Sequence, residues 1–231
     1  MSQLVDSLRE LGYAQTTLTD LFQGHFSTEL VGLRSFARNF AQSETVQRAN
    51  ECFDKGINRG ELKEFLCKFR PQALNPITDP RPDDLVWWFG KQRPVTEPIC
   101  HALGKTKIYY WWSDLWYVMP NGVSRQRAWS QSWHRDPEAD TVVKVMLYVT
   151  DVDAASGPLQ YVQRSHAGKY VDLCLPKRYP DRDIAPLIDP ADIVTFECKA
   201  DTVVFVNTSG LHRGGYTISK PRLSGVWTYV A

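Results

Sequence analysis

Residues 142–150 read VVKVMLYVT, a run made mostly of apolar and β-branched side chains. A second run, TVVFVN at residues 202–207, has the same character. Such side chains favour the pleated surface of a sheet, so both runs predict buried β-strands. The polar connection at 151–158 carries Gly157 and Pro158 and is typical of a turn that follows the first run.

Segments rich in aromatic and β-branched residues also occur before and after these two runs, from Lys107 onward. The predicted strands are Ile108–Val118, Ala128–His134, Val142–Thr150, Leu159–Gln163, Ile193–Glu197, Thr202–Asn207 and Ser224–Val230. Seven strands separated by turns predict a sandwich or a barrel. The long insertion at 169–192 holds four prolines and many charges, and connections of that length are uncommon unless they cover a site.

The first half of the chain shows helical periodicity instead. Apolar residues recur at Leu4, Leu8 and Leu11 and again through residues 30–40, and both patterns predict helices. Two short helices are expected at 83–89 and 97–103, after a proline-rich loop at 72–82. At 231 residues the chain fits one domain of ordinary size.

Composition narrows the class of protein. Twenty-seven basic and 26 acidic residues leave a net charge of +1, which disfavours nucleic acid or an anionic membrane as a partner. Five scattered cysteines without a C-x-x-C pair predict reduced thiols in a cytoplasmic protein. Neither a signal peptide nor a membrane span of 18 apolar residues is expected. The sequence leaves the oligomeric state open.

Aromatic content is high, with eight Trp, ten Tyr and ten Phe, many of them between Trp87 and Trp133. Two interpretations stay open, a large core and an aromatic wall around a substrate. Because side chains alternate along a strand, only half of the aromatics at 109–117 can line a pocket.

Candidate metal ligands lie at the ends of two predicted strands. His134 and Asp136 are two residues apart, so strand alternation turns both side chains to one face. His212 follows the strand at 202–207, and Arg222 comes ten residues later. Two histidines and one carboxylate leave three neighbouring metal positions open, the arrangement of non-haem Fe(II) oxygenases. A guanidinium at Arg222 could hold a carboxylate by two hydrogen bonds.

The order of these residues resembles the phytanoyl-CoA dioxygenase-like family of Fe(II)/2-oxoglutarate oxygenases. The blocks that carry the resemblance are Ser132–Asp136, Val145–Asp151, Ser156–Leu159 with Arg164–His166, Ala200–Phe205, and His212–Arg222. They span roughly residues 105 to 231, more than half of the chain. The helical first half resembles the family in kind, without a diagnostic motif.

The resemblance implies a fold that is mainly β with flanking α-helices around a double-stranded β-helix (jelly-roll, cupin-like) core. Residues 1–105 would form the mostly helical flank and 106–231 the core of a single 1–231 domain. His134, Asp136 and His212 would be the metal ligands and the catalytic centre, and Arg222 would anchor 2-oxoglutarate.

The chemistry that the family performs uses Fe(II), 2-oxoglutarate and O₂ and releases succinate and CO₂. The expected reaction is hydroxylation of a C–H bond in a small or medium organic metabolite. Halogenating relatives have a small residue in place of the carboxylate, so Asp136 points away from halogenation. Desaturation, cyclisation and epimerisation stay open.

One departure from the family concerns the cosubstrate. Gly214 stands where relatives often carry a hydroxyl side chain that helps to hold 2-oxoglutarate. Asn121 and Gln131 are the candidates for this second contact.

Other residues close to these motifs in the sequence are not expected to bind the metal. Arg135 and Arg213 should point away from the metal by alternation, and Trp133 should belong to the core. His166 is expected to make structural hydrogen bonds. His25 and His101 lie in the helical half and are not expected in the site.

Two other functions compete with the oxygenase. The first is an oxygen-independent, cupin-like metal isomerase or hydrolase with the same three ligands. It has no carboxylated cosubstrate, so it leaves Arg222 without a role. The second is a non-catalytic binding module, which gives no reason to keep all four site residues.

Overall fold

Two antiparallel β-sheets form the centre of the structure, a computed structural model that describes residues 2–54, 66–70, 84–120, 129–170, 173 and 181–231. The helices are α1 (Ser2–Leu11), α2 (Leu18–Phe22), α3 (Ser27–Ala41), α4 (Glu44–Asp54), α5 (Asp84–Gly90), α6 (Arg93–Leu103) and α7 (Asp181–Ile184). The strands are β1 (Tyr13–Thr17), β2 (Leu66–Phe69), β3 (Tyr109–Val118), β4 (Val142–Tyr148), β5 (Gln160–Val162), β6 (Ile193–Thr195), β7 (Thr202–Asn207), β8 (His212–Arg213) and β9 (Arg222–Val230).

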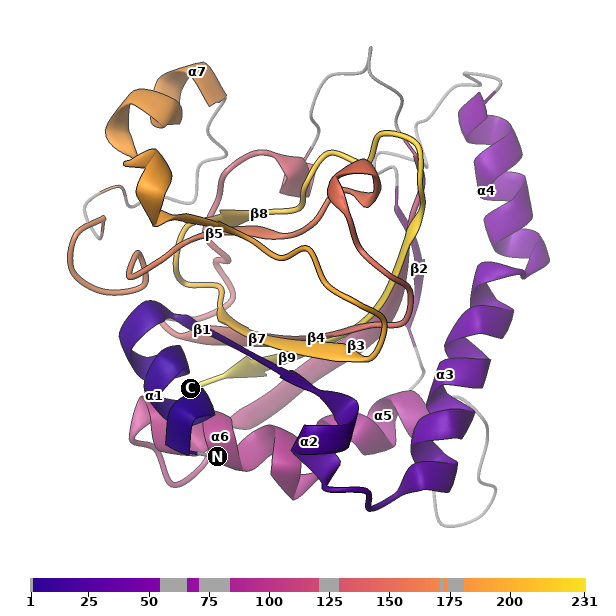
Figure 1. Ribbon diagram of the computed structural model, residues 1–231, viewed down its shortest axis with the longest axis horizontal. Helices are drawn as coiled ribbons and strands as arrows, with labels where there is room; N and C mark the ends of the chain where they lie inside the picture. The colour runs from indigo at the N-terminus through magenta and orange to yellow at the C-terminus, as the bar shows by residue number, and fades with distance from the viewer. Residues whose placement is uncertain (1, 55–65, 71–83, 121–128, 171–172, 174–180) are drawn as a thin grey trace.

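The larger sheet has six strands in the order β1-β7-β4-β9-β3-β2, and the smaller has three in the order β6-β5-β8. Figure 1 shows the smaller sheet above the larger one and the helices α1, α2, α5 and α6 below it. The fold is therefore mainly β with flanking helices, a double-stranded β-helix core as the sequence predicted.

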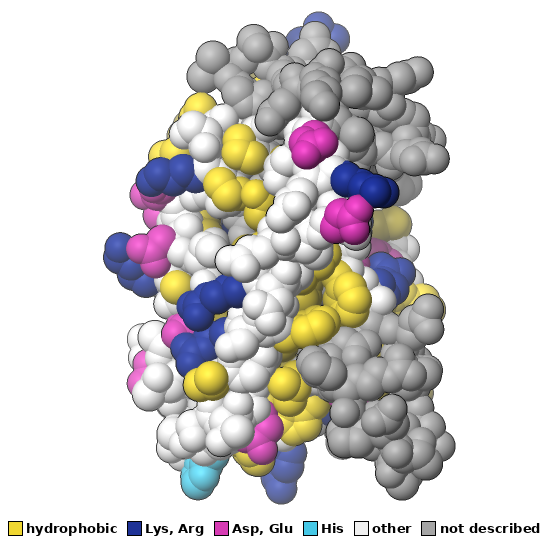
Figure 2. Space-filling model, turned by 90° about the vertical axis from the view of Figure 1, so that its right-hand side faces the viewer, with side chains coloured by type: hydrophobic (Ala, Val, Ile, Leu, Met, Phe, Trp, Pro, Cys, Tyr) yellow, Lys and Arg dark blue, Asp and Glu magenta, His cyan; other side chains and the backbone are white. Residues whose placement is uncertain are grey.

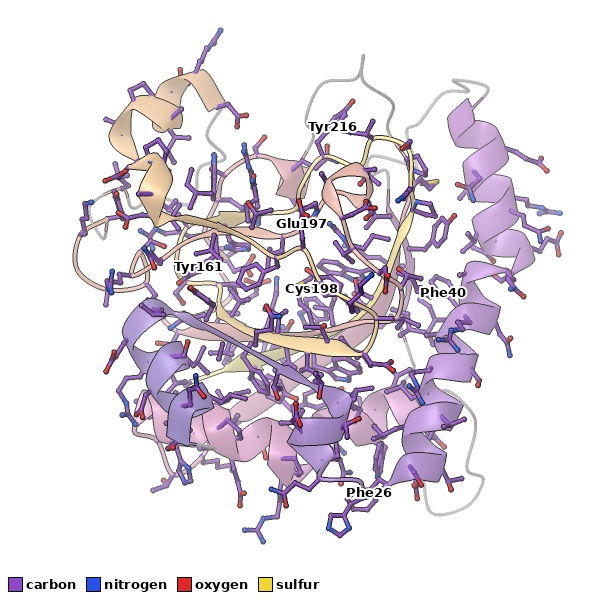
Figure 3. All side chains as sticks on the ribbon, viewed as in Figure 1. Phe26, Phe40, Tyr161, Glu197, Cys198 and Tyr216 are labelled. Atoms are coloured by element: carbon purple, nitrogen blue, oxygen red, sulfur yellow. The ribbon has the colours of Figure 1, made fainter. Side chains whose placement is uncertain are left out.

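Alternation along the strands separates two cores. On β4, Val143, Val145 and Leu147 pack against the helices, whereas Met146 and Tyr148 lie between the sheets. Tyr161 and Cys198 belong to the same inner cluster (Figure 3). The buried run at 142–150 is apolar on both sides because both faces of the larger sheet are covered.

Trp227 on β9 ties the helical layer to the larger sheet. Its side chain is fully buried, its Nε1–H donates to the Val86 carbonyl oxygen at 2.6 Å, and its ring centroid lies 4.2 Å from that of Phe89. We expect Trp227→Ala to lower the free energy of unfolding by about 3–5 kcal/mol, as buried aromatic deletions do. Urea unfolding measures this loss. Trp227→Phe should lose much less, and equal losses in the two variants would contradict the packing argument.

Most predicted strands agree with the structure, and one is wrong. Thr202–Asn207 agrees to the residue, but over the described residues 129–134 the strand predicted at Ala128–His134 does not form. Trp129–Gln131 is a 3₁₀ turn, and Trp133 and His134 make only bridges. The chain bends here because the Gly214 N–H donates to the Ser130 carbonyl oxygen at 2.7 Å, a tertiary contact that overrides local β-propensity.

The first half of the chain holds more than the predicted helices. The expected helices correspond to α1, α3, α5 and α6, but α2 and α4 were not predicted. Nor were two strands: β1 pairs with β7, and β2 pairs with β3. The helical flank thus supplies both edges of the larger sheet.

One predicted loop lies outside the described residues, and a second lies partly outside them. The proline-rich loop at 72–82 lies wholly outside them. In the insertion at 169–192, the described part contains α7 and two 3₁₀ turns, Ala185–Leu187 and Pro190–Asp192.

Surface charge is mixed on the face that carries α3 and α4. There, basic and acidic side chains alternate with hydrophobic ones rather than forming one charged field (Figure 2). Among the described residues, no helix combines the length and apolar character needed to cross a membrane.

Candidate metal centre and cosubstrate pocket

The backbone brings the two histidines together. His134 and His212 face each other across an antiparallel bridge in which each backbone N–H donates to the other's carbonyl oxygen at 3.0 Å. Directly opposite residues in such a pair project to the same side, and the two imidazole centroids lie 4.3 Å apart. Asp136 joins them because its backbone N–H donates to the Thr208 carbonyl oxygen at 2.9 Å.

The three side chains converge on one point. Their ligand atoms all lie within 4.8 Å of one another, and each residue is at most 9% exposed. His134 Nε2 lies 3.7 Å from Asp136 Oδ1, and His212 Nε2 lies 3.6 Å from Asp136 Oδ2. The Nδ1 atoms face backbone carbonyl oxygens of Ser132 at 2.8 Å and Gly210 at 3.0 Å. Donation from Nδ1–H selects the tautomer in which Nε2 carries the lone pair that binds a metal.

Electrostatics keep these groups in the protonation states that a metal needs. Burial raises the pKa of Asp136, but the Lys144 ammonium, together with the two histidines whenever they are protonated, outweighs it and holds the pKa below its usual range. Burial lowers the pKa of His212, which favours the neutral imidazole. A carboxylate beside a neutral imidazole is the deprotonated ligand set for a divalent cation.

Lys144 is a member of the site that the sequence did not reveal. It lies on β4, is 8% exposed, and places Nζ 2.7 Å from Asp136 Oδ2. Its ammonium also lies 5.4 Å from the ring centroid of Trp112. The available signal was a single charge inside an otherwise apolar strand, on the same face as Met146 and Tyr148.

Arg222 begins β9 and is 5% exposed. Its Nε and Nη1 have no hydrogen-bond partner among the described residues, and burial lowers its pKa. A buried guanidinium in this condition needs an anion to satisfy it. A Cβ added at Gly214 would lie 3.6 Å from Arg222 Nη2, so the missing side chain at 214 leaves space beside the guanidinium.

A cavity of about 200 Å³ joins the metal-ligand candidates to Arg222. Gln131 is fully buried and lines it, whereas Asn121 lies outside the described residues. Of the aromatics on β3, Trp112 and Trp116 line the cavity, whereas Tyr110, which precedes a β-bulge, packs on the helix side of the sheet. The two tryptophan rings stack at 6.3 Å between centroids. The β3 aromatics therefore divide between the wall of this cavity and the core on the other face of the sheet, and the substrate-wall interpretation stays a prediction.

Charged residues of β3 and its neighbour complete that wall. Asp114 is fully buried and accepts two hydrogen bonds from Arg70, at 2.7 and 3.0 Å, and one from Trp116 Nε1 at 3.2 Å. The Arg70 guanidinium lies over the Trp112 ring at 5.0 Å, and Lys68 lies over the Trp116 ring at 5.2 Å. The wall is cationic as well as aromatic.

Other residues near the motifs point elsewhere. Arg135 donates to the carbonyl oxygens of Ser165 at 2.7 Å and Tyr170 at 2.6 Å, and Arg213 pairs with Asp181. Trp133 is buried in a separate apolar cluster. His166 Nε2 lies 3.1 Å from the Arg9 carbonyl oxygen, a structural contact. His101 lies in α6 and His25 beside α2, so neither reaches the cavity.

Solved structures share this fold over the whole chain. The α-ketoglutarate-dependent carbocyclase SnoK from nogalamycin biosynthesis aligns with a TM-score of 0.61 and 19% identity, covering 100% of this chain and 83% of that one. EctD from S. alaskensis, crystallised with 2-oxoglutarate and 5-hydroxyectoine, aligns at 0.60 and 16%, covering 100% and 76%. HygX from Streptomyces hygroscopicus, with nickel and 2-oxoglutarate bound, aligns at 0.60 and 12%, covering 100% and 86%.

Sequence comparison gives the family. Comparison with curated proteins finds no match. A sequence model of phytanoyl-CoA dioxygenase (PhyH) matches residues 31–222, which include all four residues of the predicted centre. Because that match covers most of the chain, this protein belongs to the phytanoyl-CoA dioxygenase (PhyH) family.

Proposed function

We propose that the protein is an Fe(II)- and 2-oxoglutarate-dependent oxygenase whose metal ligands are His134, Asp136 and His212. Two imidazole nitrogens and one carboxylate within 4.8 Å of one another form the facial set that such enzymes use. The Nδ1 contacts of both histidines fix their orientation before any metal binds. The donor set therefore fits Fe(II).

The observation that carries the proposal is the buried Arg222 in the same cavity. Its unsatisfied Nε and Nη1 call for an oxyanion, and a carboxylate fits a guanidinium by two parallel hydrogen bonds. A cosubstrate with a second carboxylate, such as 2-oxoglutarate, can bind the metal at one end and Arg222 at the other. A cupin-like isomerase or hydrolase offers no ligand for this guanidinium.

Gln131 is our candidate for a second contact to the cosubstrate. Its side chain is fully buried and lines the cavity that Arg222 lines. Gly214 supplies no hydroxyl group, and the primary amide of Gln131, next to the Ser130 that bonds the Gly214 N–H, is the replacement donor that we propose. Asn121 remains a sequence-based prediction.

Bound Fe(II), 2-oxoglutarate and O₂ supply the oxidation of a substrate C–H bond, with release of succinate and CO₂. The protein's own residues orient that bond and exclude water. We propose a small or medium organic metabolite as substrate, because Trp112 and Trp116 supply a compact aromatic wall. Two proteins of similar fold have been crystallised with small molecules: SnoN with nogalamycin RO and HygX with hygromycin B.

A metabolite screen tests the reaction. The purified protein with Fe(II), 2-oxoglutarate and O₂ should form succinate faster when its substrate is present. Product mass then identifies the reaction: gain of one oxygen atom for hydroxylation, loss of two hydrogens for desaturation or cyclisation, and no change for epimerisation. Product formation that is independent of O₂ or of 2-oxoglutarate would contradict the proposal and favour the isomerase or hydrolase.

A further inference from the structure

Lys144 is the buried charge that the proposed chemistry does not use. On β4 it stands opposite Thr228 of β9, which in turn stands opposite Trp112 of β3. All three side chains share the inner face of the larger sheet. Lys144 is 8% exposed, and its ammonium forms one ion pair among the described residues, with Asp136 at 2.7 Å.

An ion pair in this place is not explained by stability. Taking two charges out of water carries a desolvation cost, and replacing such a pair by apolar residues of the same volume is often neutral or stabilising. The neighbours of Lys144 on the same face, Met146 and Val206, show that an apolar residue suits this surface. Lys144 therefore has a task at Asp136.

Lys144 is distant from the cosubstrate anchor. Its partner on β9 is Thr228, six residues from Arg222, which corresponds to roughly 20 Å of strand. Lys144 and Arg222 thus approach the metal-ligand candidates from opposite ends of the cavity. Holding the far carboxylate of 2-oxoglutarate belongs to Arg222, and Lys144 acts on the aspartate itself.

The two oxygens of Asp136 are not equivalent because of Lys144. Oδ1 lies 3.7 Å from His134 Nε2 and Oδ2 lies 3.6 Å from His212 Nε2, so the carboxylate could present both oxygens to one metal. The Lys144 ammonium forms an ion pair with Oδ2, with Nζ 2.7 Å away, although the contact lacks hydrogen-bond geometry. Oδ1 forms no ion pair with a lysine or arginine among the described residues, so it is the oxygen that would bind the metal.

We propose that Lys144 is a positioning residue that restricts Asp136 to coordination through one oxygen. This inference rests on the proposed function. With one oxygen from Asp136 and two imidazole nitrogens, three neighbouring metal positions stay open, two for 2-oxoglutarate and one for O₂. A carboxylate that binds through both oxygens would take one of these positions and weaken chelation of the cosubstrate.

Lys144→Met tests the role, because methionine fills the same space without charge. Anaerobic titration of Fe(II), and then of 2-oxoglutarate against the Fe(II)-loaded protein, measures the two affinities separately. We expect Fe(II) affinity to be kept or increased, since a nearby positive charge is removed. We expect 2-oxoglutarate affinity to fall about 10- to 100-fold, the size of the effect that loss of an outer partner of a metal ligand has on metal affinity or activity. Lys144→Arg, which keeps a cationic donor, should recover most of that loss.

Lys199→Met is the matched control, since Lys199 forms an exposed ion pair of similar length with Asp151. It should change neither affinity. Unchanged 2-oxoglutarate affinity in Lys144→Met overturns the positioning role, as does a parallel loss of both affinities that Lys144→Arg does not recover. If the wild-type protein itself binds no 2-oxoglutarate when loaded with Fe(II), the proposed function fails, which is a different result.

Discussion

Asp136→Ala should abolish 2-oxoglutarate-dependent succinate formation. The substitution removes one of three converging ligands and leaves two imidazoles, too few to hold Fe(II) firmly. It also leaves Lys144 buried without its partner, and breaking a buried ion pair in this way costs about 3–5 kcal/mol. Succinate assays and chemical unfolding of the metal-free variant measure the two effects.

Asp136→Asn separates chemistry from folding. The amide keeps the shape and leaves a carbonyl oxygen beside Lys144, so the variant should be more stable than Asp136→Ala, yet equally inactive. Succinate production at the wild-type rate in either variant would remove Asp136 from the ligand set.

Arg222→Met should have opposite effects on stability and on cosubstrate binding. The buried guanidinium has unsatisfied Nε and Nη1, so replacing it by an apolar side chain should stabilise the ligand-free protein by about 1–3 kcal/mol. Loss of two charged hydrogen bonds should raise the apparent KM for 2-oxoglutarate by about 100-fold or more. The requirement for Fe(II) should change far less.

Thermal unfolding with and without 2-oxoglutarate reports both effects on Arg222→Met. Ligand at 100 times its Kd stabilises a folded protein by about 2.7 kcal/mol, so the metal-loaded wild type should gain stability and the variant should not. Arg222→Lys, which keeps charge but loses the two-pronged geometry, should fall between them. An unchanged KM in Arg222→Met would exclude the anchor role.

The fold was largely predictable because the central strands are buried on both faces. β7 agrees with its predicted bounds, and β4 and β9 differ only at their ends. Such strands are long apolar runs whose character does not depend on which neighbour they meet. Edge strands gave no such signal: β1 reads Tyr-Ala-Gln-Thr-Thr, and only pairing with β7 makes it a strand.

The sequence predicted which side chains come together where strand geometry alone determines their direction. Strand spacing puts His134 and Asp136 on one face, and the bridge with His212 completes the set. The segment before His134 contains a 3₁₀ turn instead of the predicted strand, so the spacing argument for His134 and Asp136 applies only at the end of that segment. The alternation argument needed only the last residues of that segment.

Lys144 could not be assigned from the sequence, because a single lysine in a strand is more often at an edge or a strand end. Only the register, with β7 on one side and β9 on the other, shows that β4 is central and that residue 144 faces inward. The same holds for the aromatics of β3, since a bulge between Tyr110 and Trp112 decides which ones meet the cavity.

The most direct test of the metal and cosubstrate site is the anaerobic visible spectrum of the protein with Fe(II) and 2-oxoglutarate. Chelation of 2-oxoglutarate to iron should produce a weak metal-to-ligand charge-transfer band that neither component gives alone. The band should be absent in Asp136→Ala and should require far more 2-oxoglutarate in Arg222→Met. Wild-type protein that binds Fe(II) but develops no band with saturating 2-oxoglutarate would contradict the account.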